Sequence, residues 1–412
     1  MDSSSSNTTT DQTYLTEDFL YEIFLHLDID SIFKFKCVSK VWLSILSNPN
    51  FINRWYKVNT SLWALVHASA TEGNLKNLKV TLSHPESNSQ FICHHQTGFS
   101  FGFLDQKHDL SNTKLTDGLL IIGSSNGLVL CATSYFNQKT YYVCNPLTKK
   151  SVLLPPPPKE QMIVQTGFTC DECCFSSSLG YKVIRLPVFH CATTFNVEIF
   201  SSDLGEWNVH DVLCPPDVTW SSPRYDNLVS HNGTSYWMQK TSNKILAFSA
   251  HVNKHNNHGT YGIDSKLIEL PELPMDDENR YLSQCLGESE GFICYAIVRY
   301  TQRSLSVWVL DEDWYLLHKD IKFCDVLAQM KPSLIGVESS DDLISDIQVL
   351  GFNPVDKNVV ILHYDKYLCA YNMKTRGYQK LFHPSFLGGN LSVPGRGFST
   401  FILGKIIYMP LV

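Results

Sequence analysis

The residues that could carry chemistry in this chain include a group of cysteines and a histidine near its middle. Cys170, Cys173, Cys174, His190 and Cys191 are all of types that bind zinc. A structural zinc site takes four ligands, usually from two closely spaced pairs. Cys170 and Cys173 form one such pair, but no second pair follows at the usual spacing. We therefore expect reduced cysteines and no metal site.

Other candidate groups are also better explained as loops. His251, His255 and His258 lie in an Asn-rich stretch, and the carboxylates at 276–278 and 341–342 lie in polar stretches between predicted strands. The chain has no H-E-x-x-H, G-x-S-x-G, phosphate-binding or dinucleotide-binding motif. We therefore predict that the protein is not an enzyme and holds no cofactor.

Composition limits the class of protein further. The 412 residues suggest two or three domains or one repeat array. Lys and Arg number 33 against 40 Asp and Glu, and the resulting net charge of −7 disfavours nucleic-acid binding. Aromatic residues make up 12% of the chain, which excludes a wholly disordered chain and suits a core rich in strands.

Neither the apolar stretches nor the start of the chain indicates a membrane or secreted protein. No apolar stretch reaches the ~20 residues of a membrane-spanning helix. Residues 1–13 are rich in Ser, Thr and Asn, with no apolar core of a signal peptide, so we predict a disordered tail. The 13 cysteines are then expected to be reduced thiols in the cytoplasm, the nucleus or both.

Residues 14–58 show a helical pattern. Leu20, Ile23, Phe24 and Leu27 follow helical spacing, after Thr16 as a possible cap. Two more short helices are predicted over 32–37 and 41–46, before Asn48-Pro49, with a tail helix over 51–56. So small a module buries little surface alone, and its apolar residues exceed one core. We therefore expect part of its apolar surface to meet a partner.

This module resembles an F-box, most specifically in the run from Phe35 to Trp42, Phe-Lys-Cys-Val-Ser-Lys-Val-Trp, which is similar to that of plant F-box proteins. The resemblance implies three helices that dock on a Skp-family adaptor and, through it, on cullin and RING subunits. The matching positions are Leu15, Leu20, Ile23, Leu27, Cys37, Val38 and Trp42. Thr16 stands where the family usually has proline, which puts the strength of adaptor binding in doubt. The alternative is a three-helix bundle without a partner.

Residues 61–412 change to the pattern of short strands separated by Gly, Pro, Asn and Ser. Five similar units are visible, and the equivalent positions in them are Tyr141, Val197, Leu246, Leu305 and Leu368, at spacings of 56, 49, 59 and 63 residues. Spacings near 50 residues are typical of kelch-type propeller blades. We predict an all-β propeller of about six blades, or alternatively seven, with strands from the two chain ends sharing a blade. The fold class is α+β and multidomain.

The second half also resembles a known family. The runs Asn126-Gly-Leu-Val-Leu, Val143-Cys-Asn-Pro-Leu-Thr-Lys and Leu153-Leu-Pro are similar to the F-box-associated, kelch-like domain of plant F-box proteins. Together, the two resemblances imply the substrate-recognition subunit of an SCF-type ubiquitin ligase, whose propeller captures a target protein that the sequence does not identify. Two alternatives remain open, which are an F-box scaffold outside any ligase and a propeller enzyme.

Loops between blades are the predicted place for target binding. Trp, Tyr and Arg are enriched at binding hot spots. The residues of these types in the predicted loops are Trp220, Arg224, Tyr225, Arg280 and Tyr281. The alternative is that these side chains pack between blades.

Overall fold

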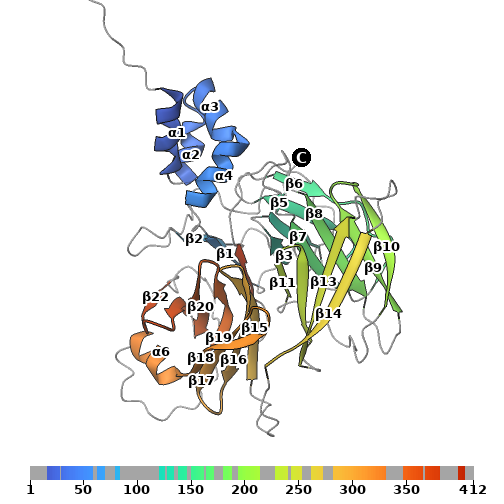
Figure 1. Ribbon diagram of the computed structural model, residues 1–412, viewed down its shortest axis with the longest axis vertical. Helices are drawn as coiled ribbons and strands as arrows, with labels where there is room; N and C mark the ends of the chain where they lie inside the picture. Colours follow the sequence, from blue (N-terminus) through green and yellow to red (C-terminus); the bar gives the residue numbers. More distant parts are fainter. Residues whose placement is uncertain are drawn as a thin grey trace, which may run out of the picture. The chain divides into compact units, whose positions relative to one another are not determined.

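A computed structural model of the chain describes residues 16–27, 29–58, 63–69, 79–83, 120–125, 128–133, 138–145, 150–161, 164–170, 180–187, 194–213, 228–239, 243–252, 261–271, 282–330, 347–364, 367–380 and 398–403. The chain forms two compact units, Met1–Thr60 and Ser61–Val412. Figure 1 shows helices in the first unit and radiating sheets in the second. The predicted tail over 1–13 lies outside the described residues.

The first unit contains four helices, where three helices followed by a short tail helix were expected. They are α1 (Glu17–Leu25), α2 (Ile29–Phe35), α3 (Lys40–Ser47) and α4 (Pro49–Val58). The expected tail helix is a full element because its first residue is Pro49. Proline is favoured at the first position of a helix, where no backbone N–H is needed. Asn48 ends α3, and its side chain also accepts a hydrogen bond from the Asn50 N–H at 2.8 Å.

Caps fix the other helix starts. The Ser39 hydroxyl accepts a hydrogen bond from the Trp42 N–H at 3.1 Å, which confirms Ser39 as the cap of α3. Thr16 occupies the cap position of α1, but its side chain makes no capping bond. Helix α2 begins at Ile29, three residues before the predicted start.

An aromatic cluster holds the helical unit together. The ring of Phe24 lies 5.1 Å from that of Trp42 and 6.5 Å from that of Phe51, centre to centre. The indole of Trp55, on α4, donates to the Leu27 carbonyl at 3.0 Å. Aromatic pairs at these separations add to the stabilisation from area burial. All four helices are therefore tied to one small core.

The second unit is built from antiparallel sheets, five of which have four strands. Blade 1 contains β3 (Leu120–Ser125), β4 (Leu128–Ala132), β5 (Tyr141–Asn145) and β6 (Lys150–Leu153). Blade 2 contains β7 (Val164–Cys170), β8 (Tyr181–Pro187), β9 (Thr194–Ser201) and β10 (Glu206–Leu213). Blade 3 contains β11 (Leu228–His231), β12 (Thr234–Gln239), β13 (Lys244–Val252) and β14 (Tyr261–Glu269).

The remaining strands complete the unit. Blade 4 contains β15 (Leu282–Ser289), β16 (Phe292–Arg299), β17 (Ser304–Leu310) and β18 (Trp314–Lys322). Blade 5 contains β19 (Gln348–Asn353), β20 (Asp356–Tyr364), β21 (Tyr367–Asn372) and β22 (Tyr378–Lys380). A smaller sheet has three strands, β1 (Trp63–Ser69), β2 (Lys79–Ser83) and β23 (Phe398–Leu403).

The prediction of about six blades, or seven, is wrong, because the described residues form five. The chain ends were expected to supply a further blade, and they form the three-stranded sheet instead. In it β1 pairs with β23, from Ala64 opposite Leu403 to Ser69 opposite Phe398. The inner strand of each sheet contacts the inner strand of the next, and β23 contacts both β19 and β3. The sheet built from the two ends therefore joins the last blade to the first.

The predicted repeat positions are equivalent in the structure. Tyr141, Val197, Leu246, Leu305 and Leu368 lie in β5, β9, β13, β17 and β21, each the third strand of its blade. The strand prediction missed β7, β11, β15 and β19, each the first strand of a blade. The all-β prediction also missed α6 (Phe323–Met330), a helix that follows β18.

Glycines in two of the missed strands allow close packing between blades. A Cβ on Gly287 of β15 would stand 2.5 Å from the ring of Phe352 on β19. A Cβ on Gly167 of β7 would stand 2.8 Å from both Ser235 and Trp237 on β12. These separations are shorter than the closest contacts that packed atoms make, so only glycine allows the strands to approach so closely at both positions.

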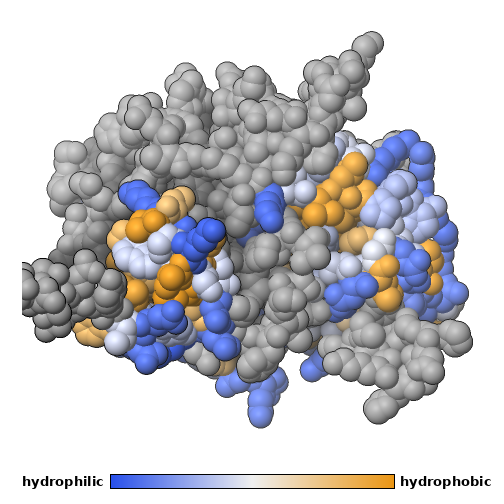
Figure 2. All heavy atoms as spheres, turned by 90° about the horizontal axis from the view of Figure 1, so that it is seen from above, coloured by the Kyte–Doolittle hydropathy of each residue, from blue (hydrophilic) through white to orange (hydrophobic). Residues whose placement is uncertain are grey.

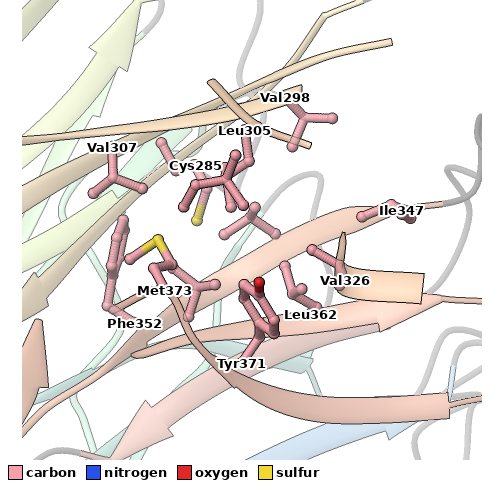
Figure 3. Close-up of a cluster of buried hydrophobic side chains, with 14 of the residues drawn as sticks. Cys285, Val298, Leu305, Val307, Val326, Ile347, Phe352, Leu362, Tyr371 and Met373 are labelled. Carbon is pink, nitrogen blue, oxygen red and sulfur yellow. The ribbon is translucent and has the colours of Figure 1, made fainter. Parts of the chain in front are cut away.

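Apolar cores lie between successive blades. Figure 3 shows one of them, in which Val298, Leu305 and Val307 of blade 4 face Phe352, Leu362 and Tyr371 of blade 5. Val326 places one side of α6 in the same core. A blade alone exposes both of its faces, and stacking against neighbours buries them.

None of the described helices is long and apolar enough to cross a membrane. Within the residues that the structure describes, no three side chains of His, Cys, Asp or Glu lie together as metal ligands.

Candidate functional site

Exposed apolar side chains on the helical unit form the candidate site. Phe19 and Ile23 are 56% and 41% exposed, and they share one side of α1 because they are four residues apart. Val38, in the turn before α3, and Val41, in the first turn of α3, are 58% and 48% exposed. Exposed large apolar side chains are a signal of protein docking where they gather, so these four residues are the candidate docking residues of the helical unit.

The structure separates the predicted adaptor residues into exposed and internal groups. Ile23, Cys37 and Val38 are exposed, whereas Leu20 is buried and Trp42 packs on Phe24 and Phe35. Leu27 is half-buried. Leu15 lies outside the described residues.

Sequence reasoning missed Phe19 and Val41 as candidates for the same surface. Phe19 lies off the predicted apolar stripe of α1, and a large apolar residue beside such a stripe is a signal of exposure. Val41 was assigned to the core of the third helix because it follows the apolar spacing there. Figure 2 shows hydrophobic side chains at the molecular surface among hydrophilic ones.

Ionic and cation–π contacts connect α1 to α4. Arg54 on α4 forms an ion pair with Glu22 at 2.8 Å and lies over the ring of Tyr21 at 5.6 Å. Burial raises the pKa of the Tyr21 hydroxyl, and the charge of Arg54 acts in the opposite direction. Tyr21 and Glu22 immediately precede Ile23 in the chain, so these contacts hold the part of α1 that carries Ile23 next to α4.

The predicted target-binding residues cannot be placed. Trp220, Arg224, Tyr225, Arg280 and Tyr281 all lie outside the described residues. The same holds for the carboxylates at 276–278 and 341–342 and for the side chains of the three histidines His251, His255 and His258.

The cysteine group is described only at Cys170. Its thiol is buried and donates a hydrogen bond to the Ser125 carbonyl at 3.2 Å, which joins β7 to β3. Cys173, Cys174, His190 and Cys191 lie outside the described residues. The hydrogen bond of the Cys170 thiol therefore connects blades 1 and 2.

A buried ionic network also lies between blades 1 and 2. Arg185 on β8 and Glu198 on β9 are almost fully buried and form a direct ion pair. The Arg185 guanidinium also donates to the Tyr141 hydroxyl at 3.0 Å, and the hydroxyl in turn donates to the Gln138 side chain at 2.9 Å. Burial raises the pKa of Tyr141, which keeps its hydroxyl protonated as a donor.

Among the described residues, the remaining contacts of Arg185 are also made within the protein. The other guanidinium contacts are the carbonyls of Lys159 and Gln138, at 3.3 and 3.4 Å. The rings of Tyr141 and Trp207 each lie 5.8 Å from the guanidinium carbon. Because its charges are paired and its donors are used, the network is a connection between blades and not a second candidate site.

Comparisons with known proteins agree with both halves of the chain. A profile of the F-box domain matches residues 14–54, and a profile described as "F-box protein At3g26010-like, beta-propeller" matches residues 100–385. Among curated proteins of Arabidopsis thaliana, F-box protein At5g07610 is 26% identical over 399 residues, which cover 89% of this chain and 84% of the relative. F-box protein At3g26010 is 23% identical over a region that covers 88% of this chain and 78% of the length of that relative.

A third relative carries a kelch name. The putative F-box/kelch-repeat protein At4g22430 of Arabidopsis thaliana is 24% identical over 91% of this chain and 81% of its own. The propeller profile alone spans more than half of the chain. The chain therefore belongs to the plant F-box proteins that carry a C-terminal β-propeller of the At3g26010-like family.

Proposed function

We propose that the protein is the substrate-recognition subunit of an SCF-type cullin–RING ubiquitin ligase. Its F-box docks on a Skp-family adaptor, and its propeller captures a target protein for ubiquitination. The chain supplies proximity between the target and the ubiquitin-charged enzyme and performs no catalytic step of its own. The observation that carries the proposal is the set of exposed apolar residues Phe19, Ile23, Val38 and Val41 on the helical unit.

The cysteines support a reducing location for this activity. The eight described cysteines are free thiols, and most of them are buried. Free thiols are the usual state in the cytoplasm and nucleus. We therefore propose either compartment, or both, as the place where the protein works.

Adaptor binding is the test. We expect the full chain to bind a purified Skp-family adaptor, and Ile23→Asp and Val38→Asp each to weaken binding by at least about tenfold, because a carboxylate would be buried in an apolar interface. Leu316→Asp is the matched control, since Leu316 is 44% exposed but lies on β18 of the propeller. Its affinity for the adaptor should not change.

Trp42→Ala tests the internal group separately. This substitution removes the contacts with Phe24 and Phe35. We expect weaker adaptor binding together with a loss of helical circular dichroism, whereas Ile23→Asp should weaken binding and leave the helices intact. If the intact chain does not bind the adaptor, the ligase proposal is wrong.

A second candidate function, a scaffold outside any ligase, is favoured by Thr16. It stands in place of the family's proline, and its side chain makes no capping hydrogen bond to α1. A chain that bound the adaptor but did not recruit cullin into the same complex, in a reconstitution from purified subunits, would support the scaffold function.

A further inference from the structure

The outer strands of the propeller differ in how their free edges are protected. These strands are β2, β6, β10, β14, β18 and β22, and in the described part of the chain no further strand pairs with them. Five of the six contain lysine, at Lys79, Lys150, Lys266, Lys319, Lys322 and Lys380. Lysine on an edge strand opposes pairing with another chain. Strand β10, Glu-Trp-Asn-Val-His-Asp-Val-Leu, contains no lysine, arginine or proline.

Strand β10 is also regular along its whole length. It pairs with β9 without a register shift, from Glu206 opposite Ser201 to Leu213 opposite Thr194. By contrast, β18 has two register shifts against β17, and Asp320 within it has a φ of 46°. Such irregularities twist an edge away from pairing. The edge of β10 therefore has neither kind of protection.

The side chains of β10 fit a partner strand. Val209 and Leu213 are 42% and 77% exposed, and Leu213 is the most exposed large hydrophobic residue in the described part of the chain. The two lie on one face of the strand, together with Trp207, whose indole donates to the Pro155 carbonyl at 2.8 Å and anchors the strand to blade 1.

The charge at the turn end of β10 is negative. Asp203 and Glu206 are both exposed there, while Asp211 further along accepts a hydrogen bond from Asn196. A segment that pairs with β10 would meet two carboxylates near the turn and apolar side chains near Leu213. This arrangement complements a segment with a basic residue at one end and apolar residues at alternate positions.

We propose that the edge of β10 docks an extended segment of the target protein by strand addition, with alternate apolar residues over Val209 and Leu213 and a lysine or arginine beside Asp203 and Glu206. Backbone hydrogen bonds to the free edge would supply affinity, and the alternate side chains would supply specificity. The inference rests on the proposed function as a target receptor and names the chemistry of the target segment.

The test uses the full chain and synthetic eight-residue peptides. One peptide alternates valine and threonine between terminal lysines, a second has glutamates in place of the lysines, and a third has the lysines but alternate N-methylated amides. We expect the lysine peptide to bind and to slow hydrogen exchange over residues 206–213. The glutamate peptide should bind at least about tenfold more weakly, and the N-methylated peptide should not bind.

A double variant, Val209→Lys with Leu213→Lys, gives β10 the protection of the other outer strands. It should weaken binding of the lysine peptide by at least about tenfold, while the matched pair Tyr315→Lys with Leu316→Lys on β18 should not. The proposal would be overturned if the β10 variant bound the lysine peptide as well as the unaltered chain does. It would also be overturned if the peptide slowed hydrogen exchange in β14 or β18 as much as in β10. If hydrogen exchange over residues 206–213 were slow without peptide and became slower at higher protein concentration, the edge would bind a second copy of the chain, and the proposal would be wrong.

Adaptor binding separates this inference from the proposed function. The β10 variant should bind the Skp-family adaptor with the affinity of the unaltered chain, because β10 is not part of the helical unit. If the adaptor binds and the peptide does not, only the edge proposal fails. If the unaltered chain does not bind the adaptor, the ligase function fails whatever the peptide does.

Discussion

Lys36, in the turn after α2, loses much of its contact with water when the helical unit folds. Burial lowers the pKa of its amine from the usual 10.5 to about 8. The folded chain therefore binds this proton more weakly than the unfolded chain. Below pH 8 the amine is charged in both the folded and the unfolded state, so folding must bury that charge at a cost in free energy. As the pH rises from about 8 to 10.5, the folded state loses the proton first, and this cost disappears.

This sign gives a prediction for the helical unit. Its stability should rise between pH 8 and 10.5, and Lys36→Met should remove that rise and stabilise the unit at pH 7 by about 1 kcal/mol. Urea unfolding followed by helical circular dichroism, at several pH values, measures both effects. Lys40→Met is the control, because Lys40 is exposed. A rise with pH that persists unchanged in Lys36→Met would contradict the assignment.

At the scale of single residues, the sequence predicted which residues belong to the helical unit better than it predicted their exposure. Leu20 and Ile23 follow the same apolar spacing, yet Leu20 is buried and Ile23 is 41% exposed. The spacing marks one side of an isolated helix, whereas exposure depends on where α3 and α4 pack. Trp42 was expected at the adaptor surface, and its aromatic neighbours place it partly inside.

At the scale of elements, strands β8 and β9 hold a buried ion pair to which a neighbouring blade adds a hydrogen-bond acceptor. Arg185 pairs with Glu198 within blade 2 and donates to Tyr141 of blade 1. Removing one partner of a buried ion pair leaves an uncompensated charge, whereas replacing both with apolar residues can cost little. The pair therefore couples the integrity of two blades.

Single and double substitutions test this coupling. Arg185→Met should lower the free energy of unfolding by about 3–5 kcal/mol, because Glu198 would be left charged and buried. The double variant Arg185→Met with Glu198→Leu should recover a large part of that loss. Urea unfolding followed by tryptophan fluorescence would measure both. If the double variant is no more stable than Arg185→Met alone, the loss comes from the Tyr141 and Gln138 contacts and not from the charge.

The strands that sequence analysis missed share a physical reason. The third strands, such as β5 and β9, are buried and carry continuous apolar runs. The first strands, such as β7 and β15, contain Gly, Ser, Thr and Gln, because they approach one another closely at the centre. That composition is also typical of loops. Helix α6 was missed because eight residues give too little periodicity to separate a helix from a strand.

At the scale of the whole molecule, the two ends of the propeller unit meet in one sheet, as the repeat pattern suggested. The number of blades was wrong because the number of strands near each end could not be counted from spacing alone. Only three strands of that sheet are described, against four in each blade. Pairing between residues so far apart in sequence leaves no local signal.

The pairing of β1 with β23 predicts the effect of shortening the chain. A chain that ends at residue 397 lacks β23, so β1 loses one of its two pairing partners and β3 and β19 each lose one neighbouring strand. We expect the propeller to lose several kcal/mol of its free energy of unfolding, which is comparable to the whole net stability of a small domain. A chain that ends at residue 403 keeps β23 and is the matched control, which should stay near full stability.

Adding the missing strand as a separate peptide sharpens this test. A synthetic peptide of residues 396–405 should restore part of the lost melting temperature of the chain that ends at residue 397. A scrambled peptide should not. If the chain ending at 397 melts like the control, β23 contributes little to closure.

The same pairing also dictates an order of events during protein synthesis. Strand β1 leaves the ribosome early, and its partner β23 is among the last segments to be made. At ordinary rates of translation the delay is on the order of tens of seconds. For most of that time β1 and β3 are already made but lack β23, the strand that completes the propeller. Nascent chains of this protein should therefore depend on chaperones until translation ends, and premature termination near the 3′ end of the message should yield a product that is degraded.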